Sequence, residues 1–157
     1  MPKDLVGVVS IDDVKEYLNK VRHIDKEIDA KEEINIQMGR RLTTVSATSY
    51  REIDVQGGVK KTSEDRIIEY IEHSEHINEM IDELINLKMK VVDEIERIND
   101  GLYRTLLTER YINNKNWEEV AGILGYDSRH TLRLHNDALR AFSKSNNSCH
   151  QMSLYDS

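Results

Sequence analysis

Three arginines and one asparagine near the C-terminus are the residues whose types and spacing suggest a chemical role. Arg129, Arg133, Asn136 and Arg140 follow one another at intervals of four, three and four residues. Because an α-helix has about 3.6 residues per turn, these intervals place the four side chains on one helical face. Arginine can donate two hydrogen bonds to guanine, and asparagine can pair with adenine. The stripe therefore predicts a helix that contacts the major groove of duplex DNA.

The residues around this stripe complete the candidate DNA-binding set. Its first two arginines lie near the N-terminal end of the expected helix, which is the end that contacts base edges in recognition helices. Ser128 and the free N–H groups of the first turn can bind a phosphate. We expect Arg140 and Lys115 to contact the DNA backbone, His130 to face phosphate, and His135 to pack in the core. The predicted DNA-binding residues are Lys115, Ser128, Arg129, His130, Arg133, Asn136 and Arg140.

Three short helices with turn residues between them are predicted to carry this stripe. They span residues 102–112, 117–124 and 128–142. Asn116 and Asp127 are candidate N-caps, and Asn116 has Glu119 three residues later, as in a capping box. Gly125 supplies the turn between the last two helices, because glycine adopts a left-handed backbone without steric cost. A short helix, a glycine turn and a longer helix are the layout of a helix-turn-helix, which we predict over residues 101–142.

The sequence of this module resembles the helix-turn-helix in region 4 of bacterial sigma factors. The resemblance lies in residues 117–121 (WEEVA), 124–126 (LGY), 138–139 (AL) and the preceding 109–112 (ERYI). Asp127 departs from the sigma-factor pattern, in which serine is usual. Together with its helical N-terminal half, nearly the whole chain resembles the ArpU/RinA-type late-gene transcriptional regulators of phages and prophages of Gram-positive bacteria. That resemblance implies control of phage transcription in the bacterial cytoplasm.

The first hundred residues predict long helices with narrow apolar stripes. One stripe begins at Val14 and continues through Ile28, and another runs from Ile67 to Ile98, with steps of three or four residues throughout. Such stripes are typical of coiled coils and helical hairpins. The sequence thus predicts an all-α protein with a coiled-coil or helical-hairpin stalk over residues 11–100. We expect a flexible connection at about 43–62 and a disordered tail over 143–157.

Composition excludes several classes of function. The 157 residues carry 32% charged side chains, with a net charge of −8 in residues 1–100 and +1 in residues 101–142. An acidic body disfavours non-specific binding to nucleic acid, so DNA binding must depend on a local patch. A single cysteine, the absence of a phosphate-binding glycine loop and the lack of a membrane-spanning apolar run predict no cofactor, no membrane insertion and no enzyme.

Two histidines one helical turn apart, His73 and His76, have the spacing of zinc ligands. A zinc site needs a third or fourth ligand, and none is evident, so we expect an ordinary polar helix face and no metal.

Two other functions remain compatible with the sequence. Region 4 of sigma factors contacts RNA polymerase as well as DNA, so the module could dock on polymerase without reading DNA. A coiled coil joined to a helix-turn-helix also suits a phage DNA-packaging component of the small-terminase type. In each case we expect self-association through the stalk, and a dimer that binds DNA would require two half-sites.

Overall fold

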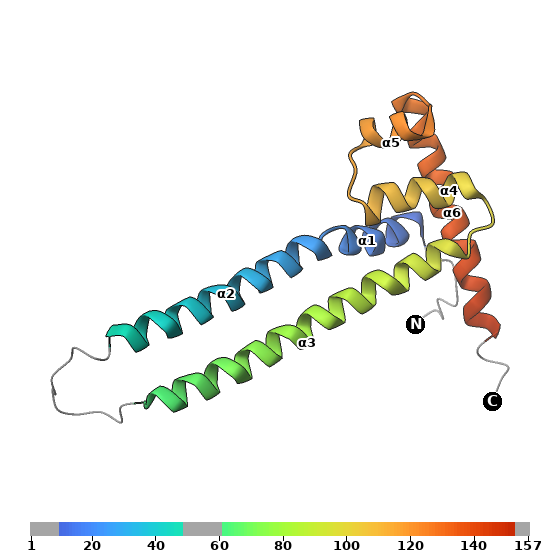
Figure 1. The fold of residues 1–157 in the computed structure, drawn as a ribbon. Coiled ribbons are helices and arrows are strands. Elements are labelled where there is room, and N and C mark those ends of the chain that lie inside the picture. Colours follow the sequence, from blue (N-terminus) through green and yellow to red (C-terminus); the bar gives the residue numbers. More distant parts are fainter. Residues whose placement is uncertain (1–9, 49–60, 153–157) are drawn as a thin grey trace, which may run out of the picture. The chain divides into compact units, whose positions relative to one another are not determined.

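The computed structural model describes residues 10–48 and 61–152, and every regular element in these two segments is helical (Figure 1). In chain order the elements are α1 (Ile11–Arg22), α2 (Ile24–Thr48), α3 (Ser63–Glu96), α4 (Gly101–Leu107), the π-helix η1 (Thr108–Ile112), α5 (Trp117–Leu124) and α6 (Ser128–Met152). The predicted all-α class is confirmed. Within the described segments no helix is both long and apolar enough to cross a bilayer.

The helices group into two compact units. The hairpin unit comprises Asp25–Ile85, and the terminal unit comprises Met1–Ile24 and Asn86–Ser157. This division corrects the expected boundary at residue 100. The first helix and the end of α3 belong with the C-terminal helices, because their apolar side chains are buried in that unit.

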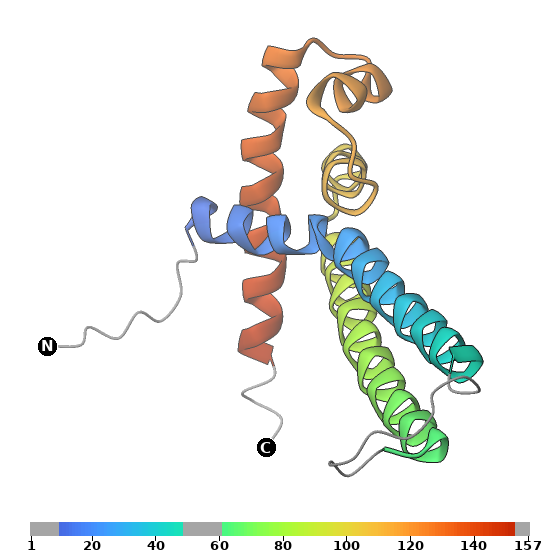
Figure 2. The ribbon, with the colours of Figure 1, turned by 90° about the vertical axis from the view of Figure 1, so that its left-hand side faces the viewer.

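The first helix begins at a capping box. Ser10 Oγ accepts a hydrogen bond from Asp13 N at 3.1 Å, and Asp13 Oδ2 accepts one from Ser10 N at the same distance, so two first-turn donors are satisfied. The helix ends at Arg22, with His23 as its C-cap, so the apolar stripe that the sequence predicts from Val14 to Ile28 is divided between α1 and α2. The first helix packs against η1 and crosses α6 (Figure 2).

The core of the terminal unit is drawn from widely separated segments. Tyr17 on α1 donates a hydrogen bond to Glu94 on α3, with 2.8 Å between Oη and Oε2. Burial and this bond raise the pKa of Tyr17. The largest fully buried side chains of the unit include Leu18, Val21, Ile24, Val91, Ile95, Ile98, Leu106, Leu107, Tyr111, Val120, Thr131 and Leu139.

The hairpin unit pairs α2 with the first part of α3 in antiparallel directions (Figures 1 and 2). Half-buried side chains form the seam between them, including Met38 and Leu42 on α2 and Tyr70, Ile77 and Ile81 on α3. A Cβ atom at Gly39 would lie 3.1 Å from Tyr70 Oη, so the tyrosine side chain reaches across the seam to the backbone of α2. The seam on α3 follows the spacing that the sequence predicts, although Ile67 is exposed.

Two helices extend further than predicted. The second helix continues to Thr48, so residues 43–48 are not part of the expected connection; residues 49–60 lie outside the described segments. The last helix continues to Met152, which corrects the prediction of a disordered tail from residue 143; residues 153–157 lie outside the described segments. Asn146 anchors this extension by donating hydrogen bonds from Nδ2 to the carbonyls of Glu94 (3.2 Å) and Phe142 (2.9 Å).

Candidate nucleic-acid interface

The fifth helix is delimited by local contacts that the sequence predicts. Asn116 Oδ1 accepts a hydrogen bond from Glu119 N at 2.9 Å, and Glu119 Oε2 accepts one from Asn116 N at 2.8 Å. This capping box starts the helix at Trp117. The helix ends at Gly125, whose φ of 74° lies in the left-handed region that glycine tolerates best. The chain therefore turns sharply between α5 and α6.

The sixth helix starts at a second side-chain cap. Asp127 Oδ1 accepts a hydrogen bond from His130 N at 2.8 Å, and the Asp127 carbonyl accepts one from Thr131 Oγ1 at 2.9 Å. These bonds confirm Asp127 as the cap of this helix. Because Thr131 is fully buried, the first turn of α6 is held against the core and its opposite face points to solvent.

Four predicted DNA-binding residues lie together on this exposed face. Ser128, Arg129, Arg133 and Asn136 are all exposed along the first turns of α6. Neither arginine forms an ion pair with any side chain of the described segments. Their guanidinium groups are therefore available to an external acceptor such as a base edge or a phosphate.

The other three predicted residues have different surroundings. Arg140 lies further along α6 and pairs with Asp137, with 2.9 Å between Nη1 and Oδ1. The ring of His130 is half-buried and lies against Tyr126, with 4.7 Å between centroids. Lys115 is half-buried in the turn before α5. Of these three, Arg140 has an intramolecular partner, and His130 and Lys115 are only partly exposed.

A buried aromatic cluster supports the exposed face from behind. His135 is 4% exposed, as its position next to the predicted core indicates, and its Nε2 lies 2.8 Å from Tyr111 Oη. Trp117 contacts the His135 ring edge-on at 4.7 Å, and the Arg110 guanidinium lies 4.4 Å from the centre of the Trp117 ring. Through these two contacts, the half-buried Trp117 anchors the start of α5 to the buried cluster.

Burial sets the protonation state of this cluster. It lowers the pKa of His135 to about 4, and the positive charges of Lys15 and Arg110 add to the effect. Burial also raises the pKa of Tyr111 to about 12. At neutral pH the imidazole is therefore uncharged, and the module is supported by a neutral hydrogen-bonded pair rather than by an ion pair.

One further residue, not predicted from the sequence, lies on the exposed face. Leu132 is 46% exposed and lies three residues after Arg129, between the two arginine-bearing turns. Helical spacing alone places it on this face, but an isolated leucine in a helix is normally assigned to the core. An exposed leucine beside arginines can contact the methyl group of thymine or an apolar surface of a protein.

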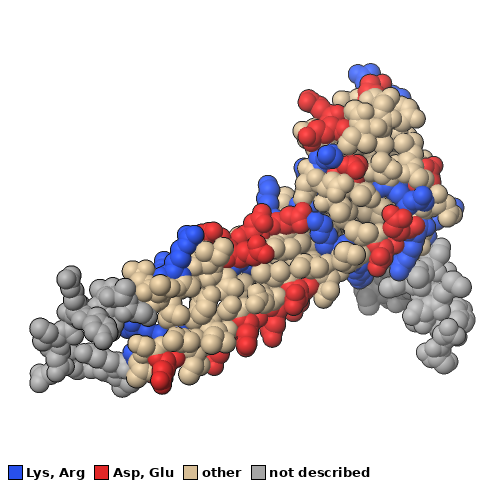
Figure 3. Space-filling model, viewed as in Figure 1, with Lys and Arg blue, Asp and Glu red and all other residues tan. Residues whose placement is uncertain are grey.

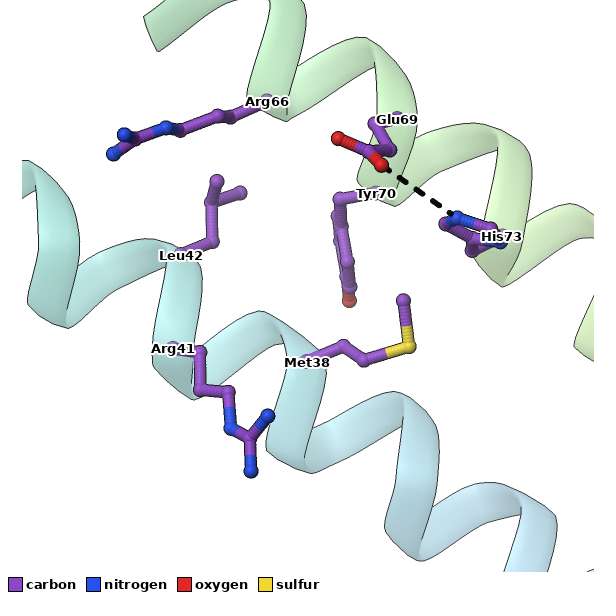
Figure 4. A pocket seen from close by; sticks show the side chains of 7 residues that line it. All are labelled: Met38, Arg41, Leu42, Arg66, Glu69, Tyr70 and His73. Atoms are coloured by element: carbon purple, nitrogen blue, oxygen red, sulfur yellow. Dashed lines mark ion pairs between the residues drawn. The ribbon is translucent and has the colours of Figure 1, made fainter. Parts of the chain in front are cut away.

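In the described part of the hairpin unit, the two histidines considered as zinc ligands lie near carboxylates. His73 lies 4.0 Å from Glu69, and His76 lies 3.8 Å from Glu79, so each histidine has one carboxylate neighbour. In residues 10–48 and 61–152 no group of three histidine, cysteine, aspartate or glutamate side chains is arranged to hold a metal ion. An open cavity between α2 and α3 (Figure 4) is lined by Met38, Arg41, Leu42, Arg66, Glu69, Tyr70 and His73.

Comparison with known sequences places most of the chain in one family. Residues 44–143 match the sequence profile of a family described as a protein of unknown function, DUF1492. The matched region includes α3, α4, η1, α5 and most of α6, and therefore the whole candidate interface. Searches of curated proteins and of solved structures each gave no significant match.

Proposed function

The chain belongs to the DUF1492 family of proteins of unknown function, and we propose that it is a phage-type transcriptional regulator that binds duplex DNA. The binding element is a helix-turn-helix formed by α5, the turn at Gly125 and α6. The observation that carries the proposal is the exposed, unpaired Arg129 and Arg133 at the start of a helix whose opposite face is buried. Recognition helices present their N-terminal residues to base edges in this manner.

Each residue of the exposed face has a distinct role in this proposal. Arg129 and Arg133 donate hydrogen bonds to guanine in the major groove, and Asn136 pairs with adenine. Ser128 and the N–H groups of the first turn bind a phosphate. The caps and the His135 cluster hold the helix in a single orientation, so that its backbone does not need to be ordered on binding.

The charge distribution supports a local rather than a diffuse DNA contact. Acidic side chains line the α3 edge of the hairpin unit (Figure 3), where residues 67–87 contain six carboxylates and no lysine or arginine. Such a surface repels phosphate. DNA binding therefore depends on the start of α6.

The first experiment is selection of genomic fragments by the purified full-length chain, followed by salt titration of the preferred duplex. We expect affinity to fall steeply with salt, because each phosphate contact releases counterions. Arg129→Ala and Arg133→Ala should each weaken binding by about 1–3 kcal/mol, roughly five- to 150-fold. Arg40→Ala, an exposed arginine of α2, is the matched control and should leave affinity unchanged.

The second candidate function is docking on RNA polymerase without autonomous DNA reading. It is favoured by three large apolar side chains exposed on the same module, Ile123 (50%), Tyr126 (43%) and Leu132 (46%). Failure to enrich any duplex at low salt would contradict our proposal. Retention of purified polymerase by the wild-type chain and by the double arginine variant, but not by Ile123→Ser, would then identify the docking function.

A further inference from the structure

The hairpin unit leaves much of its apolar surface without a partner. None of its described residues is fully buried, and Ile34, Ile36, Ile67, Ile68, Ile71 and Ile85 are each 44–54% exposed. Two helices that share a single seam bury only one stripe each, and helices of this kind normally gain stability from further packing. The unit therefore has surface for at least one additional contact.

One face of the hairpin unit is defined by the cavity in Figure 4. Arg41 from α2 and Arg66 and His73 from α3 lie around this cavity. Because residues seven apart share a helical face, Glu27 and Ile34 lie on the same side of α2 as Arg41. On α3, Glu83 shares the side of Glu69 for the same reason. We call this surface the cavity face; it carries Glu27, Ile34, Arg41, Arg66, His73 and Glu83.

The cavity face carries Arg41 and Arg66 at one end and Glu27 and Glu83 at the other, while Glu69, which also lines the cavity, is paired with Lys61 at 2.8 Å. The two arginines lie at the end of the hairpin near the connection between α2 and α3. Neither these arginines nor Glu27 and Glu83 form an ion pair within the part of the chain that the structure describes. A copy of the same surface turned end for end presents the complementary charges.

The centre of this pattern is the same on both helices. On α2, Ile34 lies midway between Glu27 and Arg41, and on α3 the midpoint between Arg66 and Glu83 falls just after His73. The shared cavity gives the relative level of the helices, because Met38 and Leu42 line it together with Tyr70 and His73. Counting back from these residues at an equal rise on antiparallel helices brings Ile34 to about the level of residue 77, within one turn of the midpoint on α3. One two-fold axis can therefore pass close to both midpoints.

We propose that two copies of this chain associate through the cavity face as an antiparallel four-helix bundle with Ile34 at its two-fold axis. Arg41 then lies opposite Glu27 of the second copy, and Arg66 lies opposite Glu83 of the second copy. Ile34 packs against its own counterpart. In a parallel dimer, the α2–α3 connections of the two copies would lie at the same end, and Glu27 and Glu83 of both copies would lie together at the other end. Charge repulsion there disfavours the parallel form and so favours the antiparallel one.

The position of the axis can be tested by cysteine cross-linking of the full-length chain. Cys149 is the single cysteine, and Cys149→Ser removes it. In that background Ile34→Cys should form a disulfide-linked dimer under mild oxidation, because a residue on a two-fold axis meets itself. Ile36→Cys is the matched control, since Ile36 is equally exposed (49% against 50%) but lies on the other face of α2. Equal cross-linking of both variants, or of neither, would overturn the proposal.

A charge exchange tests the pairing without a covalent bond. In sedimentation equilibrium, Arg41→Glu should weaken dimerisation by about tenfold, because it replaces two attractive contacts with repulsive ones. Adding Glu27→Arg should restore most of the lost affinity. A monomeric wild-type chain, a larger ring, or a double variant as weak as the single one would contradict the proposal. Neither experiment contains DNA, so the result is independent of the proposed DNA-binding function.

Discussion

Acidification is expected to destabilise the terminal unit through one side chain, His135. An unfolded chain binds a proton on histidine near pH 6.5, whereas the buried imidazole does so only near pH 4. The unfolded state therefore binds more protons throughout this interval, and folding stability must fall as the pH decreases from 6.5 towards 4. Well above pH 6.5 the imidazole is neutral in both states, and its contribution to stability no longer depends on pH.

The size of the effect follows from the two pKa values. Their separation corresponds to about 3 kcal/mol of unfolding free energy when the pH has dropped below both values. At pH 5 the loss relative to pH 7 is about 2 kcal/mol. That is a large fraction of the roughly 5–15 kcal/mol that stabilises an ordinary domain.

Urea unfolding followed by tryptophan fluorescence measures this loss directly. Trp117 is the single tryptophan and its ring lies 4.7 Å from the ring of His135, so the signal reports on the terminal unit alone. Unfolding free energies of the wild-type chain and of His135→Gln are compared between pH 7 and pH 4.5. Glutamine cannot gain a proton, and the variant should lose about 2 kcal/mol less than wild type on going to pH 5.

The comparison separates His135 from the carboxylates, which titrate in both proteins. His76→Gln, which removes an exposed histidine of the hairpin unit, is the control and should follow the wild-type pH dependence. If the stabilities of the wild-type chain and His135→Gln decline in parallel, the histidine titrates as it does in water. The assignment of a buried, neutral imidazole behind the proposed DNA-binding face would then be refuted.

Three further predictions concern the elements that position the candidate interface. Gly125→Ala should destabilise the unit by about 1 kcal/mol, because its φ of 74° disfavours a side chain; Gly122→Ala, inside α5 with no atom near its Cβ position, should stabilise it by about 0.5–1 kcal/mol. Opposite shifts in urea midpoint confirm this pair, and equal shifts contradict it. Asn116→Ala should cost about 1 kcal/mol through loss of the cap, whereas Asn116→Ser should not. Asn146→Ala should cost about 0.5–1.5 kcal/mol by removing the bond to the Glu94 carbonyl; an unchanged urea midpoint would restore the prediction of a tail that begins at residue 143.

The helices of the candidate interface were predictable because their signals act over a few residues. The Asn116 cap, the Gly125 turn and the Asp127 cap each operate within one helical turn, and all three are present where the sequence places them. Helical spacing also predicted that Arg129, Arg133 and Asn136 share an exposed face. Spacing did not indicate that Arg140 is paired with Asp137, since a side-chain rotamer decides that contact.

What the sequence by itself determined is therefore the helical class, the boundaries of α5, the start of α6 and the exposed arginine stripe. The tertiary structure decided which helices pack together. Leu18 lies off the predicted stripe, yet it is fully buried, and α1 joins the terminal unit through contacts such as that between Tyr17 and Glu94, 77 residues apart. The continuation of α6 beyond Phe142 and the neutral state of His135 also depend on contacts between segments that are far apart in the sequence. Such contacts depend on burial between distant segments, which local spacing and capping signals do not encode.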